Sequence, residues 1–112
     1  MIAVIFEVQP TDEGKPIYLD LAQSLRSELD EMEGFVSIER FESLSTPGKL
    51  LSLSIWEDEA ALTRWRAHCG HQTAQGSGRQ GVFFDYRLRV ASIIRDYGLH
   101  NRAEAPNDRA WR

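Results

Sequence analysis

Residues 50–65 read LLSLSIWEDEAALTRW. The first seven, from Leu50 to Trp56, are mostly bulky apolar residues and predict a β-strand. Asp58 and Glu59 follow directly, and acidic residues favour the positively polarised first turn of a helix. The predicted helix has an inward stripe made of Ala61, Leu62, Trp65, His68 and Cys69. This stretch therefore predicts a strand that leads straight into an amphipathic helix.

The segment upstream completes a hairpin. Residues 35–44 form a second predicted strand, and Thr46-Pro47-Gly48-Lys49 separates it from the strand at residues 50–56. A Pro-Gly pair is typical of a reverse turn. We expect the two strands to pair in antiparallel fashion.

The two ends of the domain supply the remaining elements. Residues 2–9 are β-branched and aromatic, and Pro10 closes this first strand. A helix of about 16 residues follows and ends at Gly34, with apolar positions at Tyr18, Leu21, Ala22, Leu25, Leu29 and Met32. Residues 82–94 form the longest predicted strand. Simple alternation places Val82, Phe84 and Tyr86 on one face, and Phe83 and Asp85 on the other.

The order β-α-β-β-α-β predicts an α+β fold, the ferredoxin-like split βαβ arrangement. It has a four-stranded antiparallel sheet with two helices on one face. We expect this domain to cover residues 1–98 and residues 99–112 to form a polar tail or arm. Every strand offers bulky apolar residues to both faces of the sheet, so the bare face needs a partner. We therefore expect a homodimer that buries more than about 2,000 Å² through the sheet faces.

Composition excludes several classes of protein. The 112-residue chain has a net charge of −4 with mixed signs along it, which argues against nucleic acid as a partner. It has no apolar run of roughly 20 residues and no basic leader, so we expect neither a membrane span nor a signal peptide. A lone cysteine, Cys69, suits a reducing compartment. These features predict a cytoplasmic protein.

Several short motifs resemble the antibiotic biosynthesis monooxygenase family. They are Trp56-Glu57-Asp58-Glu59, Ala61-Leu62, Trp65-Arg66 with His71, Gly34-Phe35 with Glu39-Arg40-Phe41, and Asp85-Tyr86-Arg87. The resemblance covers residues 1 to about 98 and implies a dimeric α/β barrel. Some members oxidise aromatic polyketides without metal or flavin, some bind or degrade haem, and many have no assigned activity.

Trp65 and His68 are three residues apart on the predicted helix and point to a binding site. An indole can stack on a planar ligand, and an imidazole can accept a proton near neutral pH. The alternative is that both side chains fill the core. His71 lies about 120° from Trp65 on a regular helix. The family position of His71 implies a place at the pocket mouth.

Further candidates surround these residues. Tyr86 and Arg79 are candidate donors that orient a substrate oxygen, although Tyr86 also suits core packing. The stretch from Gln75 to Arg79 resembles an anion cradle, but it lacks the spacing of a phosphate-binding loop. We therefore expect a mobile connection there. His68, Cys69 and His71 cannot converge on one metal ion from a regular helix, so we expect no metal site. Cys69 has no defined activating base.

The resemblance also frames the haem alternative. Haem-degrading relatives pair an asparagine on the first strand with a histidine some ten residues after the tryptophan. Here the first strand has Glu7 and Gln9, and the tenth residue after Trp65 is Gln75. A haem-binding or haem-degrading protein that uses His71 is therefore the second hypothesis.

The first hypothesis is a monooxygenase that uses dioxygen without a cofactor. Its substrate is a small aromatic or enolisable molecule, bound by Trp65, Tyr86 and Arg79, with His71 or His68 as the catalytic base. A third hypothesis is a non-catalytic dimeric module that binds a small ligand. The substrate itself is not predictable from the sequence.

Overall fold

The computed structural model describes residues 1–75 and 82–106, with side chains described as far as Cys69 in the first range. The strands are β1 (Ile2–Pro10), β2 (Phe35–Glu42), β3 (Leu50–Trp56) and β4 (Phe83–Ser92). The helices are α1 (Gly14–Ser24), α2 (Arg26–Glu31) and α3 (Glu59–Gln75). Among these helices, none is long and apolar enough to cross a bilayer.

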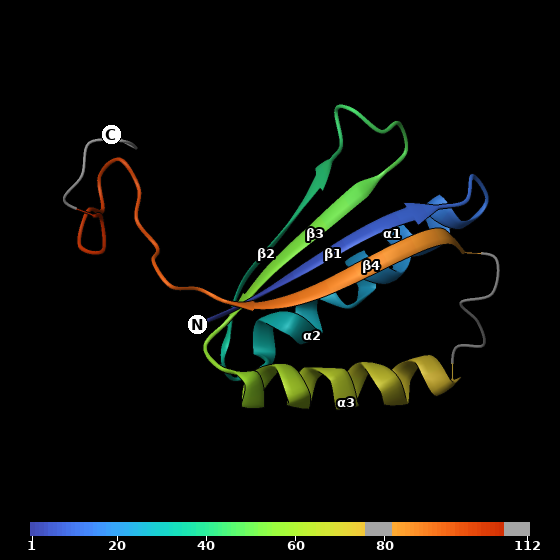
Figure 1. Cartoon of the computed structure of the whole chain (residues 1–112). Coiled ribbons are helices and arrows are strands. Elements are labelled where there is room, and N and C mark those ends of the chain that lie inside the picture. Colours follow the sequence, from blue (N-terminus) through green and yellow to red (C-terminus); the bar gives the residue numbers. More distant parts are fainter. Residues whose placement is uncertain (76–81, 107–112) are drawn as a thin grey trace.

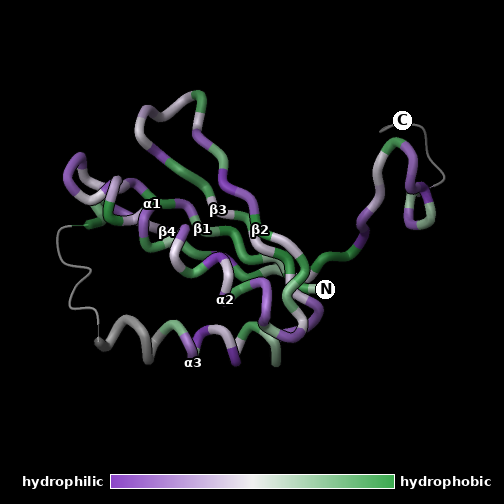
Figure 2. Tube along the Cα trace, turned by 180° about the vertical axis from the view of Figure 1, so that it is seen from behind, coloured by the Kyte–Doolittle hydropathy of each residue, from purple (hydrophilic) through white to green (hydrophobic). Residues whose placement is uncertain are grey.

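The four strands form one antiparallel sheet in the order β2-β3-β1-β4. All three helices lie on the same side of the sheet, and its other side is bare (Figure 1). This is the predicted ferredoxin-like arrangement. The hydropathy colouring marks β1, a central strand, as hydrophobic along much of its length (Figure 2).

The first predicted helix is divided at Leu25 into α1 and α2. Backbone hydrogen bonds continue through this position, because Leu25 N donates to Leu21 O and Leu29 N donates to Leu25 O. Tyr18, Ala22 and Leu29 are all buried. The break therefore leaves the predicted apolar stripe facing the sheet.

The alternation predicted for β4 is wrong at its start. The register shifts by a bulge between Gln9 and Pro10 of β1, so that Pro10 pairs with Phe83 and Gln9 with Asp85. Proline has no N–H to donate, and a bulge at that point inserts one extra residue in the facing strand. Phe83 consequently joins the helix-facing side with Phe6. Phe84 is 81% exposed.

The core lies between the sheet and the helices in two clusters. One gathers Val4, Leu29 and Leu62 around Trp56, and the other centres on Val8 and Tyr18. Trp56 is fully buried, and its Nε1 donates a hydrogen bond to Ser54 Oγ at 3.0 Å. A buried indole N–H needs such a partner.

The opposite face of the sheet carries a partly exposed apolar surface. By strand register, Ile5 of β1 lies beside Leu53 of β3, with Leu51 and Ile55 along the same strand. These four side chains are only half-buried. No described helix covers them (Figure 1). The chain after β4 runs outward from the sheet in the same view.

Among the described glycines, Gly14 lies closest to the backbone of another segment. A Cβ atom at this position would lie 2.1 Å from the carbonyl oxygen of Val82 and 2.6 Å from its Cα. We therefore expect Gly14→Ala to force the start of α1 away from Val82. Such overpacking costs about 1–3 kcal/mol, which corresponds to a fall in Tm of roughly 5–15 °C.

Gly98→Ala is the matched control for this prediction, because a Cβ there would meet no heavy atom within 4 Å. Thermal unfolding followed by circular dichroism measures both variants. Equal Tm values for Gly14→Ala and the wild type would contradict the packing described here.

Candidate functional site

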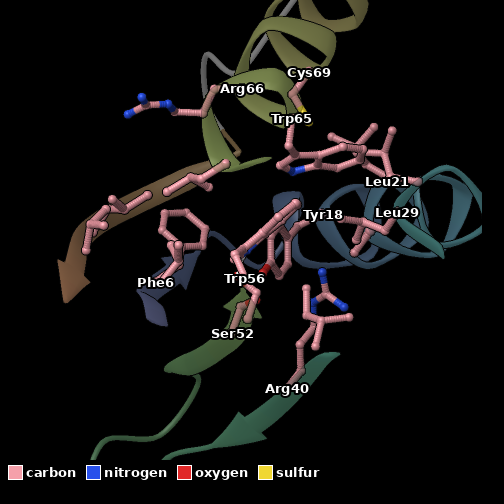
Figure 3. Close-up of a pocket in the computed structure, with 18 residues that line it drawn as sticks. Phe6, Tyr18, Leu21, Leu29, Arg40, Ser52, Trp56, Trp65, Arg66 and Cys69 are labelled. Carbon is pink, nitrogen blue, oxygen red and sulfur yellow. Dashed lines mark hydrogen bonds between the residues drawn. The ribbon is translucent and has the colours of Figure 1, made fainter. Parts of the chain in front are cut away.

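A cavity of about 260 Å³ lies between the helix-facing side of the sheet and the three helices. Figure 3 shows side chains from both layers projecting into it. Most of its lining is apolar or aromatic, which is typical of sites for small organic ligands. The lining residues are Val4, Phe6, Tyr18, Leu21, Ala22, Leu25, Leu29, Ile38, Arg40, Ser52, Ser54, Trp56, Leu62, Trp65, Arg66, Cys69, Leu88 and Val90.

The cavity exists because β3 presents small side chains to the helices. Its helix-facing residues are Leu50, Ser52, Ser54 and Trp56, whereas the larger Leu51, Leu53 and Ile55 point to the bare face. Two serines in the middle of a packed face leave a space that leucines would fill. The sequence signal for the cavity was therefore the placement of small serines on the helix-facing side of β3 and of larger residues on its other side. The prediction from sequence did not use this pattern.

Aromatic rings form two walls of the cavity. Trp65 of α3 lines it, and the Trp65 ring centroid lies 6.2 Å from that of Trp56 at an interplanar angle of 34°. Phe6 contributes from β1 and packs against Tyr18, with ring centroids 6.4 Å apart. Such walls bind flat or apolar molecules by contact area.

The cavity opens beside β4. Leu88 and Val90 line it, yet they are 53% and 42% exposed. β4 is an edge strand of the sheet. A ligand thus has an apolar route into the cavity along this strand.

Polar groups in the lining come from few residues. Arg40 of β2 lies over the ring of Tyr18, with its Cζ 5.9 Å from the ring centroid. Its Nε is buried and has no hydrogen-bond partner. Ser52 lies opposite Arg40 in the strand ladder. The sequence alone did not identify Arg40, Tyr18 or Ser52 as site residues. Their proximity follows from the strand register and from the packing of α1 on the sheet.

His68 of α3 does not line the cavity. Its ring stacks on Trp65, with centroids 5.4 Å apart and an interplanar angle of 28°. Its Nε2 lies 3.3 Å from Oε1 of Glu28, an ion-pair distance without hydrogen-bond geometry. His68 is therefore placed to support Trp65 from outside the cavity.

The other predicted site residues have different positions. Tyr86 is 61% exposed and contacts Phe6, with ring centroids 5.8 Å apart, but it is not part of the lining. His71 lies on α3, two residues after the lining residue Cys69, and its side chain is outside the described residues. Arg79 is also outside them, as is the rest of the glycine-rich segment from residue 76.

The described lining offers no histidine to a haem iron. Haem iron is held by an axial histidine, cysteine, methionine or tyrosine, and of these types the described lining contains Tyr18 and Cys69. The volume is also below the roughly 300–1,000 Å³ of pockets that enclose drug-sized ligands. The described residues contain no group of three His, Cys, Asp or Glu side chains that could hold a metal ion.

A charged cluster lies at one end of the bare face. Glu7 of β1 forms salt bridges with Lys49, at 3.0 Å, and with Arg89 of β4. These two cations lower the pKa of the Glu7 carboxyl below 4.5, with the hydrogen bond from Lys49 as the largest cause.

The structure is a ferredoxin-like domain with a largely apolar cavity between its two layers. The sequence profile of the family described as antibiotic biosynthesis monooxygenase matches residues 1–77. The chain therefore belongs to the antibiotic biosynthesis monooxygenase family. This confirms the resemblance predicted from the short motifs.

One curated relative is similar over most of the chain. A jasmonate monooxygenase of Pyricularia oryzae is 50% identical over 93 residues, which cover 83% of this chain. The match covers 43% of that relative's own length.

Solved structures share the fold at low sequence identity. A Deinococcus radiodurans protein assigned to the same family has a TM-score of 0.73 at 16% identity, covering 88% of this chain and 98% of its own. The haem degrader MhuD of Mycobacterium tuberculosis has a TM-score of 0.67 at 13% identity, and the match covers 88% of this chain and 100% of MhuD. The cofactor-independent oxygenase SnoaB of Streptomyces nogalater has a TM-score of 0.65 at 12% identity, and the match covers 85% of this chain and 94% of SnoaB.

Proposed function

We propose that this protein is a monooxygenase that uses dioxygen without a metal, flavin or haem. The observation that carries the proposal is the apolar cavity walled by Trp65 and Trp56, in a chain of this family. The name of the Pyricularia oryzae relative, a jasmonate monooxygenase, supports monooxygenase activity. The fold shared with SnoaB is compatible with it.

The substrate must supply the electrons itself. A carbon flanked by an aromatic ring or a carbonyl group loses a proton to give a stabilised carbanion, which transfers an electron to dioxygen. Recombination gives a hydroperoxide, R₂CH–OOH, which loses water to give the ketone. The balance is R₂CH₂ + O₂ → R₂C=O + H₂O, so no external reductant enters.

The residues of this chain then need only bind the substrate, exclude water and remove a proton. Trp65 and Trp56 hold the apolar body of the substrate and exclude water, which raises the reactivity of the carbanion. We assign proton removal to a histidine of α3. His71 is the first candidate, because it follows the lining residues Trp65 and Cys69 on α3. The other histidine of this helix, His68, is paired with Glu28.

Donors to the developing enolate oxygen complete the proposal. The buried phenol of Tyr18 belongs to the lining. Tyr86 contacts Phe6 next to the open side along β4 and is proposed to guide the substrate. Arg79 keeps the role of a donor proposed from the sequence. Each of these groups would stabilise negative charge on oxygen.

We also propose that two copies associate through the bare faces of their sheets. The support is the half-buried surface of Ile5, Leu51, Leu53 and Ile55, which no described element of the same chain covers. Burial of such a patch in a two-fold interface would remove it from water.

Oxygen consumption tests the proposal. Purified protein treated with a chelator is mixed with jasmonic acid or with an anthrone, each of which has enolisable C–H bonds. We expect one dioxygen consumed per product with at least one substrate and no added reductant. Absence of consumption with both, or consumption only after haemin is added, would contradict the proposed chemistry.

A further inference from the structure

We propose that Arg40 is the specificity-determining residue of the cavity and binds the carboxylate of a small apolar acid. This inference rests on the proposed function, since it names the class of substrate for the same cavity. The carboxylate would lie at the β2 side, and the apolar body would extend towards Trp65 and the opening beside β4.

Arg40 has no charged partner among the residues that the structure describes. None of the salt bridges among the described residues includes it, and its Nε is buried without a hydrogen-bond partner. Glu39 belongs to the opposite face of the sheet by register, where it pairs with Leu53. A guanidinium kept partly buried without an anion is costly. A ligand that brings a carboxylate would remove this cost.

The charged residues of the described lining are all basic. The lining contains two arginines, Arg40 and Arg66, and no aspartate or glutamate among the described residues. Arg66 is exposed and donates a hydrogen bond to Thr63 Oγ1. It points away from the cavity in Figure 3, whereas the guanidinium of Arg40 points into it. The cavity therefore prefers an anion, and Arg40 is the cation placed to meet it.

Further side chains near Arg40 suit a carboxylate. Ser52 faces Arg40 across the ladder and lines the cavity, and the ring of Tyr18 lies against the Arg40 guanidinium. The planar guanidinium presents its N–H groups as a fork that matches both oxygens of a carboxylate. A hydroxyl beside this fork can donate a further hydrogen bond. A phosphate or sulfate would need more donors than this apolar cavity offers.

The test compares acids with their alcohols as ligands. Octanoate, decanoate and 4-phenylbutanoate, with the three matching alcohols, are titrated by calorimetry into the full-length protein. Charge-assisted hydrogen bonds stabilise by enough to make the acids bind about 10- to 100-fold more tightly than the alcohols. Arg40→Met should remove this preference. Arg40→Lys should retain part of it, because lysine keeps the charge and loses the fork.

Arg66→Gln is the matched control and should change the preference by less than about 3-fold, as expected for an exposed charge. The proposal is overturned if none of the acids binds, if the alcohols bind as tightly as the acids to the wild type, if the preference survives in Arg40→Met, or if it disappears in Arg66→Gln. Binding is measured without turnover. If the protein prefers acids over alcohols through Arg40 but consumes no oxygen, the result would contradict the proposed function and leave this inference standing.

Discussion

Leu53→Asp is expected to convert the protein from a dimer into a monomer. Leu53 lies in the middle of the bare face, between Ile5 of β1 and Glu39 of β2. In a two-fold interface each substitution occurs twice, and an unpaired buried charge costs at least about 3 kcal/mol. Two such charges would weaken association by about 10⁴-fold or more.

Sedimentation velocity at micromolar concentration measures this change. Leu99→Asp is the control, because Leu99 is 81% exposed and lies beyond β4. It should sediment as the wild type does. A wild-type monomer, or a Leu53→Asp dimer with unchanged stability, would contradict the proposed interface.

The second large effect is expected at the catalytic base. His71→Ala should lower kcat by roughly 10²–10⁴-fold, the usual contribution of a general base. The rate of the wild type should fall at acid pH, because a protonated imidazole cannot accept the substrate proton. Trp65→Phe should instead raise KM, since it removes contact area and leaves the proton transfer in place.

His68→Ala separates support from catalysis. His68 stacks on Trp65 and lies beside Glu28, so its loss should loosen Trp65 and affect KM more than kcat. Steady-state kinetics on the two single variants and the double variant make the comparison. If all three oxidise substrate at the wild-type rate, catalysis by histidine is wrong.

The fold was predictable from sequence because its signals are local. The bulky apolar residues among positions 50–56 and the Pro-Gly turn before them predict a hairpin without reference to the rest of the chain. Residues 50–56 also match β3 at both ends. The bulge at Pro10 could not be predicted in this way, because it depends on which residue of β4 lies opposite. As a result, Phe83 was assigned to the wrong face.

The site was only partly predictable because a cavity is a property of facing elements. Trp65 was identified from the helical stripe, and it does line the cavity. Arg40 is one polar residue among several on β2, and only the register with Ser52 and the contact with Tyr18 distinguish it. His68 was placed on the inward stripe from its angle on the helix, yet its ring lies against Trp65 and beside Glu28 instead of in the cavity lining.

Isotope labelling tests the central claim most directly. Chelator-treated protein is given ¹⁸O₂ in ordinary water, with the substrate that supports oxygen consumption and no reductant. The proposed mechanism predicts one ¹⁸O atom in the organic product by mass spectrometry and the second in water. Product oxygen derived from the solvent, or turnover that requires added haem, metal or reductant, would show that the protein is not a cofactor-independent monooxygenase.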